Sequence, residues 1–327
     1  MPRYPVHYSR EATMEKVGII GMGLIGRAWA IVFARAGFQV AAWDGTPGAV
    51  KRSLAAVDTS LADLEAAGLI SEPHTAVRAR IVEAATLEEA AANTVYVQES
   101  VTEKLDDKRA IYSALDAAAP AGAVLGSSTS AIQCSHFTEH LAGRARCLVA
   151  HPVNPPYLVP IVELSGAPWT SAVTIARARA IHERAGQVPI TVLKEIDGFI
   201  LNRLQSALLN EAFRLIEGGY VSPDDLDRTV KDGLGLRWSF MGPVETADLN
   251  APAGIADYLK RYSAIFRGVD TSIRAAEPWS DAVIPVVDAA RRSAAPTEKI
   301  AAHQAWRDRR LMALLAHKAA QAKLPKP

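Results

Sequence analysis

The chain of 327 residues is 49% hydrophobic and 22% charged, which is typical of a globular protein of about two domains. Lysine and arginine number 36 against 35 acidic residues, and the net charge of +1 gives no reason to expect nucleic acid or an anionic membrane as a partner. The two cysteines form no CxxC pair, and no apolar run approaches the ~20 residues of a membrane span. We therefore expect a cytoplasmic protein.

Residues 1–15 are polar and lack the apolar segment of a signal peptide, so we expect a flexible leader before the first domain. From residue 16 onward, short apolar runs alternate with helical patterns, as in βαβ units. Helices are predicted at 27–37, 48–69 and 174–186. Strands are predicted at 17–20, 39–44, 95–100, 123–128, 147–151, 159–164 and 188–193.

Helical signals dominate from Asp197 onward. Asp197 is predicted to cap a helix that stops at Gly218 and Gly219. Ser222 and Pro223 indicate the start of another helix, and residues 301–322 form a further amphipathic pattern. The sequence thus predicts an α/β, Rossmann-like domain over residues 16–197 and an all-helical domain over residues 198–327.

The segment GMGLIG, residues 21–26, lies directly between a predicted strand and a predicted helix. In such a turn Gly21 allows the tight bend, Gly23 lets the backbone approach a pyrophosphate, and Gly26 permits close packing of helix on strand. The helix N-terminus, with Leu24 and Ile25, would present N–H groups to the anion. This pattern predicts a dinucleotide cofactor.

Asp44 ends the second predicted strand, where a carboxylate binds the adenosine ribose. A carboxylate there also repels a 2′-phosphate, so the predicted cofactor is NAD rather than NADP. Taken alone, Asp44 fits equally well as the N-cap of the helix that follows. The strand, glycine turn, helix and carboxylate together favour NAD.

His151 and Glu163 stand at the two ends of HPVNPPYLVPIVE, which four prolines stiffen. A turn between them could return the carboxylate to the imidazole, fix its tautomer and stabilise its protonated form. Oxidation of an alcohol by hydride loss needs such a base for the hydroxyl proton. A structural histidine and a solvated carboxylate are the alternative, which the pattern alone leaves open.

Ser130 follows another predicted strand, at the edge where open α/β sheets bind ligands. Its hydroxyl could donate to a substrate oxygen or only cap the next helix. Asn202 lies one turn into the first predicted helix of the second domain, where its amide could reach a cleft or face water. The segment HFTEH, residues 136–140, fits a zinc pattern, but no third ligand is visible, so we expect no metal.

In this order, the motifs SSTS, HPVNP, PIVE and GFILNR resemble the 3-hydroxyacyl-CoA dehydrogenase family, over nearly the whole chain from residue 16. The resemblance implies a Rossmann-like domain and a helical domain through which two subunits pair. It implies His151 as the base, with Glu163 as its partner. It also implies that Ser130 and Asn202 bind the reacting oxygen, with Asn154 as a further substrate contact.

The segment ESVTEKLDDK adds Glu103 and Lys108, which match the family's pair near the nicotinamide ribose. Within the family, GLGLRWSFMGPVET and QAWRDRRLM are most similar to the lambda-crystallin group of L-gulonate 3-dehydrogenases. The enzymes that act on acyl-CoA have a shorter G-x-G-Y-P-M-G-P-F there, without Arg237. An arginine at this position could hold a free carboxylate by a bidentate contact.

The segment 51–80 has only four basic residues, Lys51, Arg52, Arg78 and Arg80, which is thin cover for the phosphates of CoA. The prediction is therefore an NAD-dependent L-3-hydroxyacid dehydrogenase that oxidises a small free acid, such as L-gulonate or 3-hydroxybutyrate, to the 3-keto acid. Two alternatives stay open. One is an L-3-hydroxyacyl-CoA dehydrogenase, and the other is a crystallin-type structural protein that binds NADH with little turnover.

Overall fold

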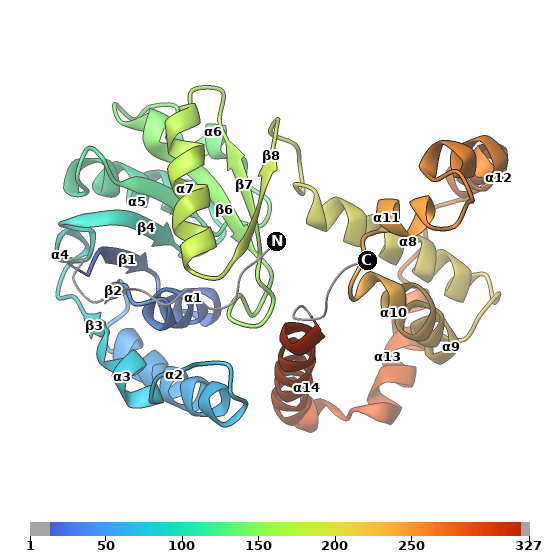
Figure 1. The fold of residues 1–327 in the computed structure, drawn as a ribbon, viewed down its shortest axis with the longest axis horizontal. Coiled ribbons are helices and arrows are strands. Elements are labelled where there is room, and N and C mark those ends of the chain that lie inside the picture. Colours follow the sequence, from blue (N-terminus) through green and yellow to red (C-terminus); the bar gives the residue numbers. More distant parts are fainter. Residues whose placement is uncertain (1–13, 322–327) are drawn as a thin grey trace. The chain divides into compact units, whose positions relative to one another are not determined.

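The computed structural model describes residues 14–321, which form two compact units (Figure 1). The first unit comprises residues 14–203 and 308–321, and the second comprises residues 204–307. Residues 1–13 of the predicted leader lie outside the described residues. The second unit differs from the predicted helical domain because the end of the last helix belongs to the first unit.

The first unit is built on a sheet whose described strands follow the order β3-β2-β1-β4-β5-β6-β7-β8. Neighbouring strands are parallel except for β6 and β7, which are antiparallel. The chain reverses its direction of travel across the sheet between β1 and β4, which is where such sheets bind dinucleotides. The strands are β1 (Lys16–Ile20), β2 (Gln39–Trp43), β3 (Ile81–Glu83), β4 (Thr94–Glu99), β5 (Val124–Ser127), β6 (Cys147–Pro152), β7 (Ile161–Gly166) and β8 (Val188–Val192).

Helices cover both faces of this sheet, because alternate residues of each buried strand point to opposite sides. One hydrophobic cluster contains side chains of α1 (Leu24–Arg35), α2 (Ala49–Ala66), α3 (His74–Ala79) and α7 (Ala172–Arg184). The other contains side chains of α4 (Leu87–Ala91), α5 (Leu105–Ala118) and α6 (Cys134–Thr138). The last helix, α14 (Ile300–Gln321), adds Met312 to the first cluster.

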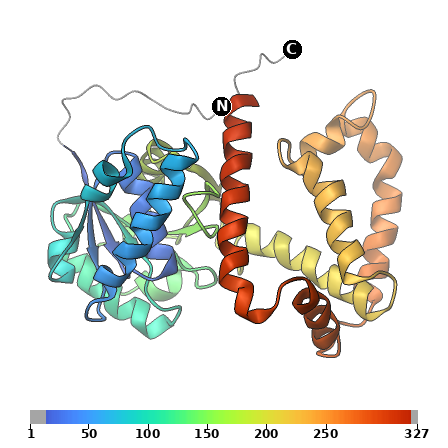
Figure 2. The ribbon, with the colours of Figure 1, turned by 90° about the horizontal axis from the view of Figure 1, so that it is seen from below.

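The second unit consists, among its described residues, of helices and the loops between them (Figure 2). The prediction at Ser222 is confirmed, since its hydroxyl caps α9 by accepting the N–H of Asp225 at 3.1 Å. The helices are α8 (Leu201–Glu217), which begins in the first unit, α9 (Pro223–Arg228), α10 (Gly235–Trp238), α11 (Pro243–Asp248), α12 (Ile255–Ala275) and α13 (Val283–Ala294). Short turns of other helix types occupy Arg144–Arg146, Thr229–Leu234 and Thr297–Lys299.

The predicted cap at Asp197 is wrong. The chain turns at Gly198 and Phe199, both with positive φ, and a right-handed helix cannot include them. Helix α8 therefore begins at Leu201, and the Asp197 carboxylate accepts a hydrogen bond from the Gln133 amide at 2.7 Å.

Within residues 14–321, no helix combines the length and the apolar character needed to cross a membrane.

Candidate active site

The glycine-rich turn between β1 and α1 has two glycines that the protein itself requires. Gly21 has φ +89°, and a Cβ there would lie 2.7 Å from the carbonyl oxygen of Ser100. A Cβ on Gly26 would lie 1.8 Å from the carbonyl oxygen of Gly21. A Cβ on Gly23, in contrast, would meet no described protein atom within 4 Å. The packing therefore explains Gly21 and Gly26 and leaves open space at Gly23, where a pyrophosphate would approach.

Helix α1 begins at Leu24, directly after Gly23, and no described side chain caps its N-terminus. Its first N–H groups, including that of Ile25, are thus available to an anion. The Asp44 carboxylate lies beside this turn and accepts the N–H of Met22 at 2.8 Å. Its other oxygen accepts the N–H of Thr46 at 2.8 Å, and Asp44 does not cap α2, which begins only at Ala49.

His151 and Glu163 lie directly opposite each other on the antiparallel strands β6 and β7. The Nδ1 atom of His151 and the Oε2 atom of Glu163 are 2.8 Å apart, so the predicted contact between the two side chains is present. Both residues are buried, with 6% and 1% of their surface exposed. Glu163 lies within β7, and its burial rules out the solvated carboxylate that the sequence left open as the alternative.

The second oxygen of Glu163 binds the start of helix α8. Its Oε1 atom accepts the backbone N–H groups of Ile200 and Leu201, each at 2.9 Å. Burial by itself raises the pKa of the Glu163 carboxyl, but the hydrogen bonds from His151 and these two N–H groups outweigh it and hold the pKa below its usual value. Glu163 is therefore ionised at neutral pH and can stabilise positive charge on His151.

Ser130 and Asn202, which the sequence places far apart, meet in the first unit. The Asn202 amide donates to the backbone carbonyl of Ser130 at 2.9 Å. Asn202 is the second residue of α8, so it lies nearer the helix start than the sequence suggested. Ser130 is exposed, and it does not cap α6, whose N-cap is Gln133.

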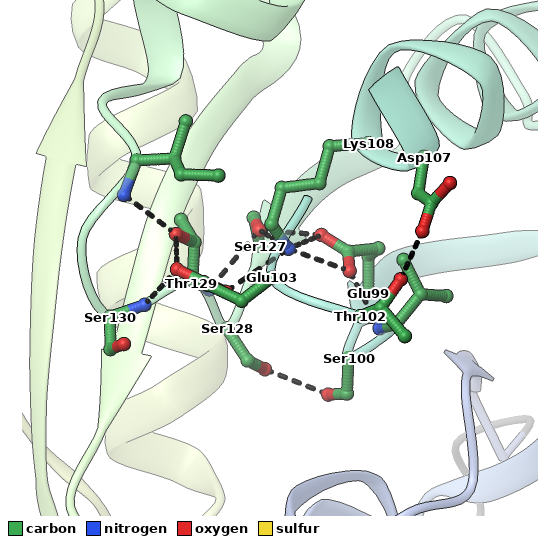
Figure 3. A network of polar contacts seen from close by, with 12 residues as sticks. Glu99, Ser100, Thr102, Glu103, Asp107, Lys108, Ser127, Ser128, Thr129 and Ser130 are labelled. Atoms are coloured by element: carbon green, nitrogen blue, oxygen red, sulfur yellow. Dashed lines mark hydrogen bonds and ion pairs between the residues drawn. The ribbon is translucent and has the colours of Figure 1, made fainter. Parts of the chain in front are cut away.

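Glu103 holds the loop that carries Ser130 (Figure 3). Its Oε1 atom accepts the N–H groups of Ser130 and Ala131 at 3.0 and 3.2 Å, and also the hydroxyl of Thr129. The backbone of Ser130 is thus fixed at its N–H by Glu103 and at its carbonyl by Asn202.

Lys108, the second member of the predicted ribose pair, is 1% exposed. Its ammonium lies 3.0 Å from Oε1 of Glu99 and 3.7 Å from Oε2 of Glu103. Glu99 also accepts the hydroxyl of Ser127 at 2.5 Å. Glu99 was not among the site residues predicted from the sequence, although a carboxylate that ends a buried strand is the signal that could have identified it.

The remaining predicted substrate contacts are Asn154 and Arg237. Asn154 is exposed in the loop between β6 and β7, where its peptide bond to Pro155 is cis. Arg237 lies in α10 of the second unit, whereas the other predicted site residues lie in the first. Among residues 14–321, no group of three or more His, Cys, Asp or Glu residues could hold a metal ion.

Comparison with known families shows where the chain belongs. Residues 16–196 match the NAD binding domain of 3-hydroxyacyl-CoA dehydrogenase, and residues 198–285 match the C-terminal domain of the same enzyme. The chain belongs to the 3-hydroxyacyl-CoA dehydrogenase family. The Rossmann-like fold and the NAD cofactor predicted from the sequence are confirmed. This family member is an NAD-dependent oxidoreductase that acts on a CH–OH group, and the family uses small hydroxy acids or CoA thioesters as substrates.

Individual relatives agree with this assignment. The family member is 42% identical to lambda-crystallin of Oryctolagus cuniculus, over 89% of this chain and 92% of the relative. It is 37% identical to L-carnitine dehydrogenase of Streptomyces coelicolor, over 92% of this chain and 94% of the relative. Among solved structures, an NAD+-dependent 5-formyl-3-hydroxy-2-methylpyridine 4-carboxylic acid 5-dehydrogenase superposes with a TM-score of 0.79 at 26% identity, over 92% and 97%. The 3-hydroxybutyryl-CoA dehydrogenase of Escherichia coli superposes with a TM-score of 0.64 at 26% identity, and the match covers 73% of this chain and 50% of that enzyme.

Proposed function

We propose that this protein is an L-3-hydroxyacid dehydrogenase that oxidises the C3 hydroxyl of a small free acid to the 3-keto acid. The observation that carries the chemistry is the buried contact of 2.8 Å between His151 and Glu163. Removal of a hydroxyl proton requires a general base, and an ionised carboxylate can hold that base in position.

In the proposed mechanism, His151 donates its Nδ1–H to Glu163, which leaves the lone pair of Nε2 to accept the C3 hydroxyl proton. Bound NAD supplies the acceptor for the hydride that leaves C3. As His151 becomes positively charged, the ionised Glu163 stabilises it without taking the proton.

Ser130 and Asn202 are proposed to hold the substrate oxygen while it becomes a carbonyl. The Asn202 amide carries two N–H donors, and one of them already binds the Ser130 carbonyl. The second donor and the exposed Ser130 hydroxyl are free to serve the substrate. Because Glu103 and Asn202 fix the Ser130 backbone, its hydroxyl starts from a defined position.

For the cofactor, we propose that the pyrophosphate lies over Gly23 and the start of α1, and that Asp44 binds the adenosine ribose. Glu103 and Lys108 remain the proposed pair for the nicotinamide ribose. Glu103 is the member that can reach the ribose directly, because 41% of its side chain is exposed and that of Lys108 is 1% exposed.

The distribution of basic side chains favours a free acid over a CoA thioester as the substrate. The segment that would cover CoA phosphates has few basic side chains, and Arg78 and Arg80 are already paired with Asp58 and Glu72. Arg237 offers a partner for a free carboxylate. L-Carnitine, the substrate named for one relative, is itself a free 3-hydroxy acid.

The test compares initial rates of NADH formation with L-gulonate, L-3-hydroxybutyrate, L-carnitine and 3-hydroxybutyryl-CoA. We expect kcat/KM to be highest for a free acid, and Arg237→Ala to raise the KM of that acid about tenfold or more. Arg228→Ala, which removes an exposed arginine from the same unit, should leave it unchanged. Highest kcat/KM with the thioester would contradict the free-acid proposal, and no turnover with any compound would favour the crystallin-type alternative.

We also propose that two copies pair through the helical unit. Few described side chains of this unit are buried in the single chain, namely Ala212, Ile216, Thr246, Val283 and Ala295. Along α12, Leu259, Tyr262, Phe266 and Val269 form a stripe at helical spacing, with 39–53% exposure. Burial of this stripe by a second copy would remove it from water.

The proposed compartment is the cytoplasm. Cys134 and Cys147 are both buried free thiols, which fits a reducing environment.

A further inference from the structure

Phe199 has a backbone conformation that an aromatic residue rarely adopts. Its φ is +47°, in the left-handed region, and Gly198 before it has φ +74°. The other described residue of this kind is Asn93, whose short side chain tolerates the conformation. For phenylalanine the conformation is strained, so the surrounding structure must hold it in place.

The backbone turn at Phe199 aims two N–H groups at the proposed catalytic pair. Directly after it, the N–H groups of Ile200 and Leu201 both donate to Oε1 of Glu163 at 2.9 Å. The N–H of Phe199 itself bonds back to the carbonyl of Ile196 at 3.1 Å, which closes the turn. The left-handed residue therefore sets the direction from which helix α8 reaches the carboxylate.

The side chain of Phe199 contacts the other member of the pair. Its ring is fully buried, and its centroid lies 5.5 Å from that of the His151 imidazole, at an interplanar angle of 43°. This contact restricts rotation of the imidazole, while Glu163 fixes its Nδ1 atom. A glycine or an asparagine would adopt the backbone conformation with less strain, but neither could supply the ring.

We infer that Phe199 is a positioning residue for the His151–Glu163 pair, acting on the carboxylate through its backbone and on the imidazole through its ring. This inference rests on the proposed function, in which His151 is the base. Phe199 exchanges no proton itself. Its effect is on the direction in which Nε2 of His151 points.

If Phe199 had a purely structural role, its loss should have the same effects as the loss of another buried aromatic residue in the same core. Phe199 belongs to the same hydrophobic cluster as Phe137, which is also fully buried but whose ring contact is with Tyr112. If Phe199 only fills the core, Phe199→Ala and Phe137→Ala should both lower stability and should affect catalysis alike. Phe137→Ala is therefore the matched control.

The first measurement is kinetic. With the best substrate of the four above, we expect Phe199→Ala to lower kcat about tenfold or more while the Kd of NADH stays within about twofold. Phe199→Leu, which keeps an apolar side chain, should recover part of the loss. Phe137→Ala should retain the kcat of the parent protein.

The second measurement does not depend on turnover. The Nδ1–H proton of His151, identified by its loss in His151→Asn, is followed by NMR in the full chain. We expect Phe199→Ala to shift or broaden this signal, and Phe137→Ala to leave it unchanged.

A third comparison isolates the backbone. Phe199→Gly and Phe199→Ala both remove the ring, but only glycine relieves the left-handed strain. Phe199→Gly should therefore have a higher Tm than Phe199→Ala. A higher Tm for Phe199→Ala would contradict the proposal that the backbone at this position is strained.

The two proposals fail separately. Full turnover in His151→Asn would remove the base from the proposed function, and the NMR signal would still decide whether Phe199 positions the pair. An unchanged signal and an unchanged kcat in folded Phe199→Ala, with His151→Asn inactive, would overturn the inference alone.

Discussion

Glu163 uses both of its oxygens, and this explains how a buried carboxylate stays ionised. One oxygen binds His151, and the other binds two N–H groups at the start of α8. These hydrogen bonds outweigh the cost of burial, which by itself favours the protonated form. Because its pKa is lowered in the folded state, Glu163 contributes stability above the usual glutamate pKa, and that stability is lost as the pH falls through the lowered value.

At the same scale, Asp44 should determine the choice of cofactor. We expect Asp44→Ser to raise the KM for NAD about tenfold, because the ribose loses charge-assisted hydrogen bonds, and to improve the use of NADP. Initial rates with both cofactors measure this. Asp63→Ser, an exposed position on α2, is the control and should change neither KM. Equal use of NAD and NADP by the parent protein would contradict the role of Asp44.

At the scale of elements, the β6–β7 hairpin brings the proposed base and its partner together. The sequence predicted both strands but not their opposite directions. The connection from Val153 to Pro160 is too short for the crossover that parallel strands need. The length of this connection could therefore have predicted the antiparallel pairing. The resulting register places His151 opposite Glu163.

Local patterns identified the main elements of the sheet and the glycine turn, because both depend on neighbours in the chain. Contacts across the fold could not be predicted in this way. The start of α8 depends on the conformation of Phe199 and on a carboxylate that lies 37 positions earlier than Ile200. The Glu103 contacts to the Ser130 loop span 27 positions, and no periodicity encodes them.

Helix α7 carries a histidine that should make stability depend on pH. His182 is fully buried beside Trp29 and Phe33, and its Nε2 atom lies 3.0 Å from the Tyr96 hydroxyl. Burial lowers the pKa of His182 to about 3. Between the usual histidine pKa and this value the unfolded chain binds a proton that the folded chain does not, so stability is lost as the pH falls through this window.

We therefore expect His182→Phe to flatten the pH dependence of the free energy of unfolding. From pH 7 to pH 5, the histidine should account for about 2 kcal/mol of lost stability. Urea unfolding of both proteins at the two pH values gives the difference. His140→Gln removes an exposed histidine and should preserve the original dependence. An unchanged pH dependence in His182→Phe would show that His182 is not held neutral.

At the scale of the whole molecule, the helical unit should require a second copy. Its α12 stripe exposes large apolar side chains that a single chain leaves in water. We expect light scattering to give twice the chain mass of 35.0 kDa. Phe266→Glu should shift the protein to the monomer, because a charge would be buried in the interface. The control Thr271→Glu changes an exposed residue of the same helix and should leave the dimer intact. A monomeric parent protein would contradict the proposed pairing.

The most direct test of the proposed chemistry is a single turnover with excess enzyme, in which NADH formation is followed in the parent protein and in His151→Asn. The proposal predicts that the variant binds NADH normally but forms it at least about 100-fold more slowly, because general-base catalysis by His151 is lost. NADH formation at the parent rate in His151→Asn would contradict it.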